Sequence, residues 1–198
     1  GEHIIKSMQE IRPDKVMRLA MLFHDIGKPQ TISQDDSGIH HFYGHPSVSE
    51  KMTKEILRRL KFDNYTIYMV SNLVKFHDYE VEPGAKYVRR AIMKTGEDIF
   101  PLLFEVKEAD IKAQSSYRRE EKEKKLKEIH EIYDEILACN QCVSLKGLAV
   151  TGRDLIEDAG MKPGKELGEM LKKLLNVVIE EPAKNEKEIL IKLAREFK

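Results

Sequence analysis

The sequence contains only two cysteines, Cys139 and Cys142, among its 198 residues. So few cysteines exclude a disulfide framework as the basis of the fold. The two have the spacing of a redox or zinc motif, but no second pair follows, and a lone pair outside a βαβ context is weak evidence for either function. These observations favour the reducing cytoplasm as the compartment of the protein.

Net charge and long apolar runs are also absent. The 34 basic and 34 acidic residues cancel to a formal net charge of zero. A nucleic-acid-binding module usually carries a basic excess, so any contact with nucleic acid would need a local basic patch. No apolar run is long enough to cross a bilayer, and the N-terminus has no secretory signal pattern, so no membrane partner is expected. Because the chain begins with glycine, we expect a trimmed start with native sequence upstream.

The composition is that of a globular protein, with 41% hydrophobic and 34% charged residues. Apolar residues recur with helical spacing nearly throughout, which predicts an all-α fold. We expect a helical bundle over residues 1–140 and a smaller C-terminal helical extension over 141–198, where glycines begin to mark turns. Residues 31–44 are predicted to form a loop. Helices are expected at about 3–9, 14–23, 46–60, 63–77, 86–94, 98–114, 116–138, 166–179 and 185–197.

The adjacent residues His24 and Asp25 stand at a predicted helix end, just before the stop signal of Gly27 and Pro29. Imidazole nitrogen and carboxylate oxygen together suit Mn, Fe, Ni, Co, Mg or Zn to varying degrees. Neighbouring side chains on a helix point about 100° apart, so the pair alone is weak evidence for a metal site. Further ligand types stand at other predicted helix ends and on one core-facing helix: His3, His45, His77 and Asp110.

This ordered set resembles the HD superfamily of metal-dependent phosphohydrolases. In that family a histidine, a His-Asp pair and a distal aspartate bind one divalent metal ion. The resemblance implies that His3, His24, Asp25 and Asp110 are metal ligands here. Members with two ions add two histidines, whose places are taken by His45 and His77. The expected activity is that of a phosphomonoesterase or cyclic phosphodiesterase acting on a nucleotide or RNA-end phosphoester, in a domain covering residues 1–140.

A narrower resemblance covers nearly the whole chain. The stretches 17–29 (MRLAMLFHDIGKP), 41–45 (HFYGH), 148–156 (LAVTGRDLI) and 162–168 (KPGKELG) are similar to the HD-containing C-terminal half of bacterial CCA-adding tRNA nucleotidyltransferases. The nucleotidyltransferase head of that family, with its Gly-Gly and paired-aspartate signature, has no counterpart in these residues. This chain alone is therefore not expected to add nucleotides to tRNA, and residues 141–198 would correspond to the tail of that family.

The expected chemistry assigns a role to three side chains. A divalent ion lowers the pKa of a bound water toward about 7 and so prepares it for attack on phosphorus. Asp25 is the natural bridging carboxylate if two ions bind. Lys28 can place a positive charge on a phosphate oxygen, and His41 is a candidate for protonating the leaving oxygen.

Each of these residues also has a purely structural interpretation. The His24-Asp25 pair, His45 and His77 can serve as helix-end polar groups, and Asp110 can pair with a neighbouring lysine. Lys28 and His41 can be solvated surface groups. Asp78 can orient His77 without being a metal ligand itself. Arg89 and Arg90 could reach a phosphate, but the favoured interpretation is an exposed pair on a helix surface.

Two alternative functions remain open. The first is an RNA- or tRNA-binding body region that uses the HD fold as a scaffold, with a local basic stripe on the last helices formed by Lys172, Lys173, Lys192 and Arg195. The second is a helical oligomerisation module, which predicts that no metal binds at all.

Overall fold

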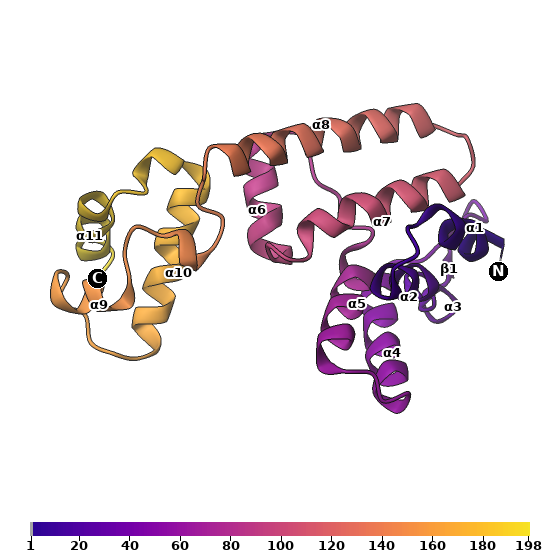
Figure 1. Cartoon of the computed structure of the whole chain (residues 1–198), viewed down its shortest axis with the longest axis horizontal. Coiled ribbons are helices and arrows are strands. Elements are labelled where there is room, and N and C mark those ends of the chain that lie inside the picture. Colours follow the sequence, from indigo (N-terminus) through magenta and orange to yellow (C-terminus); the bar gives the residue numbers. More distant parts are fainter. Residues whose placement is uncertain (1) are drawn as a thin grey trace. The chain divides into compact units, whose positions relative to one another are not determined.

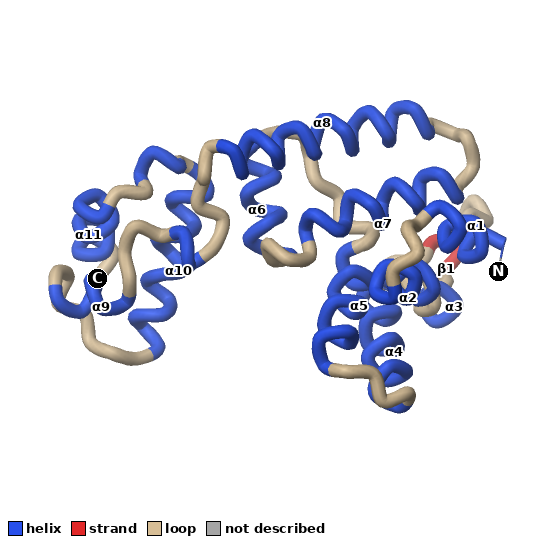
Figure 2. Tube along the Cα trace, viewed as in Figure 1, coloured by secondary structure: helices blue, strands red, loops and turns tan. Residues whose placement is uncertain are grey.

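The computed structural model describes residues 2–198. Helices make up most of the described chain (Figures 1 and 2), which confirms the predicted all-α fold. Within the described residues, strands are confined to an antiparallel hairpin of β1 (Ser33–Gln34) and β2 (His40–His41), inside the stretch predicted as a loop. The helices are α1 (Glu2–Glu10), α2 (Lys15–Phe23), α3 (Lys28–Thr31), α4 (His45–Arg59), α5 (Asn64–Phe76), α6 (Ala85–Thr95), α7 (Phe100–Ala113), α8 (Arg119–Ala138), η1 (Leu145–Gly147), α9 (Gly152–Glu157), α10 (Lys165–Glu180), η2 (Pro182–Lys184) and α11 (Lys187–Glu196).

The chain forms two compact units. The first comprises residues 1–80 and 98–130, and the second comprises residues 81–97 and 131–198. The predicted first domain, residues 1–140, therefore contributes segments to both units. The assignment of separate functions to residues 1–140 and 141–198 stays a prediction. No helix of the described chain has both the length and the apolar character needed to span a membrane.

In the first unit, two aspartates fix where helices begin. The Asp14 carboxylate accepts hydrogen bonds from the Val16 and Met17 amides, and that of Asp63 accepts one from Thr66. Such N-caps satisfy amides that have no partner within the helix. Helices α2, α4 and α5 then pack around a shared apolar core made of Phe23, Leu57, Ile67, Val70 and Val74. This packing brings the C-terminal ends of α2 and α5 together with the start of α4, and those three points carry His24, His77 and His45.

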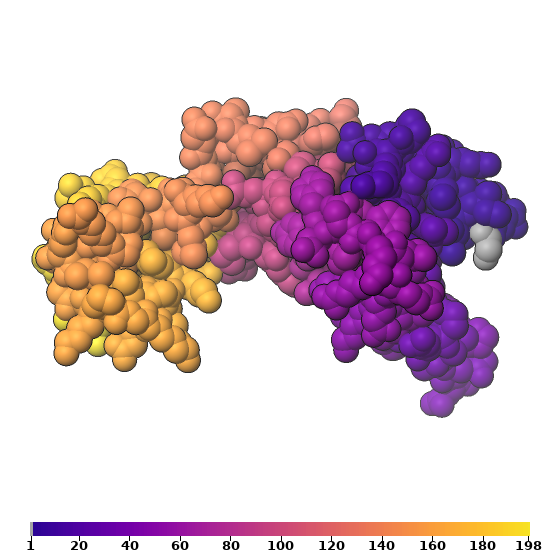
Figure 3. All heavy atoms as spheres, turned by 60° about the horizontal axis from the view of Figure 1, so that its bottom comes forward, coloured from indigo at the N-terminus to yellow at the C-terminus, as the bar shows by residue number. Residues whose placement is uncertain are grey.

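The second unit has its own core beneath α9, α10 and α11, and Figure 3 shows these segments, coloured orange to yellow, as closely packed atoms. Thr151 and Asp154 form a reciprocal capping box at the start of α9. Apolar side chains spaced along α10 face this core, among them the fully buried Leu174 and Val178. The predicted C-terminal helices thus fold around a core of their own.

Arg89 is buried, which corrects its interpretation as half of an exposed helix pair. Its side chain is 5% exposed. The guanidinium donates from Nε to the Ile179 carbonyl (2.8 Å) and from Nη1 to Gln141 Oε1 (2.8 Å). The Ile179 carbonyl belongs to the last turn of α10, where the helix dipole favours a cation. Its neighbour Arg90 is exposed and pairs with Glu180. Arg89 therefore joins α6 to the end of α10 within the second unit.

Replacing Arg89 by methionine should lower the free energy of unfolding by about 2 kcal/mol, because two acceptors inside the unit lose their donor. Urea unfolding followed by circular dichroism measures the change. Arg90→Met is the matched control, since an exposed ion pair contributes at most about 1 kcal/mol. Equal effects of the two substitutions would contradict the structural role of Arg89.

Candidate metal centre

His24 and Asp25 follow directly on the last turn of α2. The His24 side chain is buried, and its Nδ1 donates a hydrogen bond to the Met21 carbonyl (2.7 Å). That bond fixes the ring so that Nε2 faces the carboxylate of Asp25, 3.3 Å from Oδ2. Metal-binding histidines usually anchor their second nitrogen in this way. Because α2 ends at Phe23, Asp25 lies outside the regular helix, and its carboxylate can approach the ring of the preceding His24.

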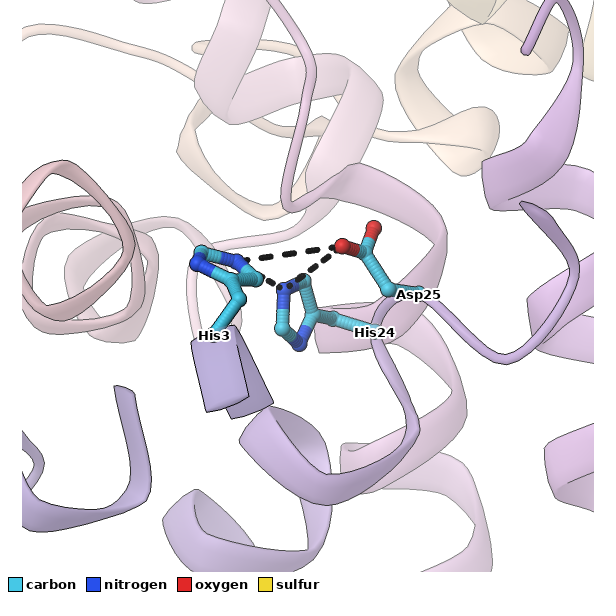
Figure 4. Close-up of side chains that lie close together, drawn as sticks. All are labelled: His3, His24 and Asp25. Atoms are coloured by element: carbon cyan, nitrogen blue, oxygen red, sulfur yellow. Dashed lines mark hydrogen bonds and ion pairs between the residues drawn. The ribbon is translucent and has the colours of Figure 1, made fainter. Parts of the chain in front are cut away.

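His3 and Asp110 meet this pair from α1 and α7. His3 Nε2 lies 3.3 Å from His24 Nε2, 3.8 Å from Asp25 Oδ2 and 3.0 Å from Asp110 Oδ1. Figure 4 shows a nitrogen of the His3 ring, a nitrogen of the His24 ring and one oxygen of the Asp25 carboxylate converging on one another. The four residues that the HD resemblance implies as ligands of one ion are therefore brought together, from three helices.

His45 and His77 form a second group on the other side of Asp25. Each anchors its Nδ1 on the carbonyl three residues earlier: His45 donates to Phe42 (2.9 Å) and His77 donates to Val74 (2.7 Å). Their Nε2 atoms lie 3.3 Å apart and 3.4 and 3.7 Å from Asp25 Oδ1. Asp25 thus offers Oδ2 to one group and Oδ1 to the other, which is the placement of a bridging carboxylate.

The Asp25 carboxylate supplies the clearest test of whether a metal ion fits. Its Oδ1 is buried and has no hydrogen-bond donor in the described part of the chain. A buried acceptor without a donor costs about 1–3 kcal/mol. The ring nitrogens nearest to it, His45 Nε2 and His77 Nε2, are left as lone-pair donors if each Nδ1 keeps its proton for the carbonyl. Convergent imidazole and carboxylate donors of this kind suit a divalent ion, so the residues present fit one.

The charges around the cluster follow from burial and from the carboxylates. Burial alone would lower the pKa of His24, but Asp110 and Asp25 outweigh it and raise the pKa to about 9. Burial alone would likewise raise the pKa of Asp25, but His24 and Lys28 hold it well below its usual range. Burial lowers the pKa of His77 to about 4, so this ring is neutral. In the protein without an ion, a proton on His24 balances the carboxylates, and a bound cation would take its place.

Lys28 reaches the cluster and His41 occupies a separate position. Lys28 Nζ lies 2.6 Å from Asp25 Oδ2 and 5.8 Å from the centroid of the Phe42 ring. His41 stands in β2, where its Nε2 contacts Asp35 Oδ2 at 2.8 Å. Among the described residues, no direct contact joins His41 to the six candidate ligands. Its role as a proton donor stays a prediction.

The remaining contacts revise two structural interpretations. The group that orients His77 is the Val74 carbonyl and not Asp78, which is exposed. Asp110 contacts His3 and His24 and accepts a hydrogen bond from Gln114 Nε2 (2.7 Å); within the described chain, it forms no ion pair with a lysine.

Sequence reasoning did not single out Lys107. Burial lowers the pKa of its ammonium group, against the opposing influence of Glu80, Asp78 and Asp110. Lys107 precedes Asp110 by one helical turn on α7, and residues three apart share a helix face. That spacing is the signal that would have identified it as a basic group beside the cluster.

Comparison with known proteins gives the family. The family described as tRNA nucleotidyltransferase domain 2, putative, matches residues 30–194. The chain therefore belongs to this family, as the narrower resemblance predicted. The matched range begins after His24 and Asp25, so membership of the HD superfamily and the role of those two residues stay predictions.

Three relatives show similarity along the chain. The A-adding tRNA nucleotidyltransferase of Deinococcus radiodurans is 27% identical over 179 residues, which are 87% of this chain and 41% of that protein. The CC-adding tRNA nucleotidyltransferase of Thermus thermophilus is 30% identical over 164 residues, 82% of this chain and 36% of the relative. The CCA-adding enzyme of Ligilactobacillus salivarius is 43% identical over 54 residues, 27% of this chain and 13% of that enzyme. The chain thus spans about two fifths of the first two relatives.

Proposed function

We propose that this chain is the helical, tRNA-contacting body region of a tRNA nucleotidyltransferase-like protein. The observation that carries the proposal is the family match over residues 30–194. A chain with zero net charge binds RNA through a local basic surface. Lys172 and Lys173 on α10 and Lys192 on α11 are exposed and suit phosphate contacts. Arg195 instead donates to the Asp158 carbonyl at the end of α9, which leaves the three lysines as the basic stripe.

Replacing both Lys172 and Lys173 by glutamine should weaken tRNA binding roughly tenfold or more and reduce the slope of log affinity against log salt by about 2, one for each lost phosphate contact. Filter binding or fluorescence anisotropy with tRNA at several salt concentrations measures both quantities. A matched control removes the same charge from α4 and α8 by Lys51→Gln and Lys124→Gln. Equal losses in both double variants, or no tRNA binding by the parent protein at low salt, would rule out the stripe.

We further propose that the His/Asp cluster binds one or two divalent ions and hydrolyses a nucleotide or RNA-end phosphoester. The partnerless Asp25 Oδ1 between two groups of histidine Nε2 atoms supports this function. A divalent ion would polarise the phosphoester and activate water. One ion would be held by His3, His24, Asp25 and Asp110, and a second by Asp25, His45 and His77.

The other side chains in this proposal act on the substrate. Lys28 holds its ammonium beside Asp25, where it adds positive charge for a phosphate oxygen. His41 is the candidate that protonates the leaving oxygen. The test is hydrolysis of 2′,3′-cyclic nucleotides and simple phosphomonoesters by protein loaded in turn with Mn, Ni, Co, Fe, Mg and Zn. We expect metal-dependent turnover; no turnover with any of these metals would leave the cluster as part of a tRNA-binding scaffold.

A further inference from the structure

The hairpin before α4 carries an exposed aromatic stack. The Tyr43 side chain is 77% exposed, and its ring stacks on that of His41, with centroids 5.1 Å apart and planes at 9°. His41 is held from the other side of the hairpin by Asp35, whose carboxylate also accepts from the Ser37 and Ile39 amides. A large apolar ring in this position buries little surface on folding. The hairpin nevertheless keeps it in a fixed orientation.

The stack is adjacent to the candidate metal centre. Tyr43 precedes His45 by two residues, so their Cα atoms lie at most about 7.6 Å apart. The intervening Gly44 has a φ of 77°, a left-handed turn that leaves Tyr43 exposed while His45 is buried. Phe42 connects the hairpin to the centre twice: its carbonyl accepts from His45 Nδ1, and its ring lies near the Lys28 ammonium. The aromatic surface thus borders on the place where a phosphate would bind.

We propose that Tyr43, supported by His41, is a stacking platform for the nucleobase of the substrate, so that the centre acts on nucleotides or RNA ends rather than on sugar phosphates. This inference rests on the proposed phosphohydrolase function. Every nucleobase has a flat π-face, so a stacking platform adds affinity for any base and discriminates little among them. The stack uses the faces of the two rings, and it leaves Nδ1 of His41, the ring nitrogen that does not contact Asp35, for proton transfer.

Two probes that differ only in the base test the platform. Calorimetry on the Mn-loaded protein compares adenosine 5′-phosphorothioate with ribose 5-phosphorothioate. Tyr43→Ala should weaken binding of the adenosine probe roughly tenfold and leave the ribose probe unchanged, whereas Tyr43→Phe should retain affinity for both. Tyr65→Ala is the matched control: that ring is 67% exposed on the first turn of α5, a helix of 13 residues that places it about 18 Å along the axis from the His77 end.

Equal affinity of both probes for the parent protein, or an equal loss of both in Tyr43→Ala, would overturn the platform. Parallel hydrolysis assays distinguish failure of the stacking platform from failure of the proposed phosphohydrolase function. Metal-dependent turnover of sugar phosphates and nucleotides at equal rates, unchanged in Tyr43→Ala, would refute the platform and keep the hydrolase. A Tyr43-dependent preference for the adenosine probe without any turnover would support the platform and refute the hydrolase. Binding of neither probe would refute the platform.

Discussion

Replacing Asp25 by alanine is expected to abolish divalent-metal binding at both histidine groups and, with it, phosphoester hydrolysis. Asp25 is the residue whose two oxygens face both groups, with Oδ2 3.3 Å from His24 Nε2 and Oδ1 3.4 Å from His45 Nε2. Loss of a residue outside the ligand set typically costs 10–100-fold in metal affinity. Removal of the shared carboxylate should exceed that range, because both ions lose it at once: one keeps Asp110 as its carboxylate ligand, and the other keeps none.

The measurement is metal content after dialysis together with turnover of a 2′,3′-cyclic nucleotide. Asp78→Ala is the matched control, since this aspartate directly follows His77 but is exposed. Asp25→Asn keeps the shape of the side chain and removes its charge, so it distinguishes loss of a ligand from loss of packing. Circular dichroism checks that each variant is folded. Retained binding of metal by folded Asp25→Ala protein would show that Asp25 is not the ligand shared by the two histidine groups.

The sequence predicts the positions of the helices and of the candidate ligands along the chain better than it predicts the contacts that these residues make with distant segments. Asp14 and Asp63 are local signals: each stands at the start of a predicted helix, and each caps the helix that follows it in the structure. His24 and His77 stand at helix ends in the sequence and in the structure, where each reaches a carbonyl three residues back. These features depend on neighbours in the chain, so they can be read from a short stretch of residues.

Features that depend on distant segments could not be predicted. Arg89 looks like any exposed helical arginine, and only the end of α10, ninety residues away, gives it a buried carbonyl to bind. The hairpin in the predicted loop has strands of two residues, too short for an alternating pattern. That His45 and His77 share one oxygen of Asp25 follows from the packing of α2, α4 and α5, which the spacing of these residues does not reveal.

Gly27 is where the close packing of the turn after Asp25 against α4 determines the geometry of the candidate centre. Its amide donates to Ser49 Oγ at 2.9 Å. A Cβ at this position would lie 2.7 Å from the Ser49 amide nitrogen and 2.8 Å from the His45 carbonyl oxygen. Both atoms belong to the backbone of α4, so a change of side-chain rotamer cannot relieve the contact. Any residue other than glycine must push the turn after Asp25 away from the first turns of α4.

Gly27→Ala should therefore lower the free energy of unfolding by about 3 kcal/mol or more, the upper part of the range for overpacking a core. It should also weaken binding of an ion at His45 and His77, because His45 moves with α4 relative to Asp25. Thermal and urea unfolding measure the first effect, and metal titration at a temperature where the variant is folded measures the second. Gly168→Ala is the control: it lies inside α10 with no atom within 4 Å of the added Cβ, so it should stabilise the chain by about 0.5–1 kcal/mol. If Gly27→Ala matches Gly168→Ala in both measurements, the close contact between this turn and α4 does not determine the geometry of the centre.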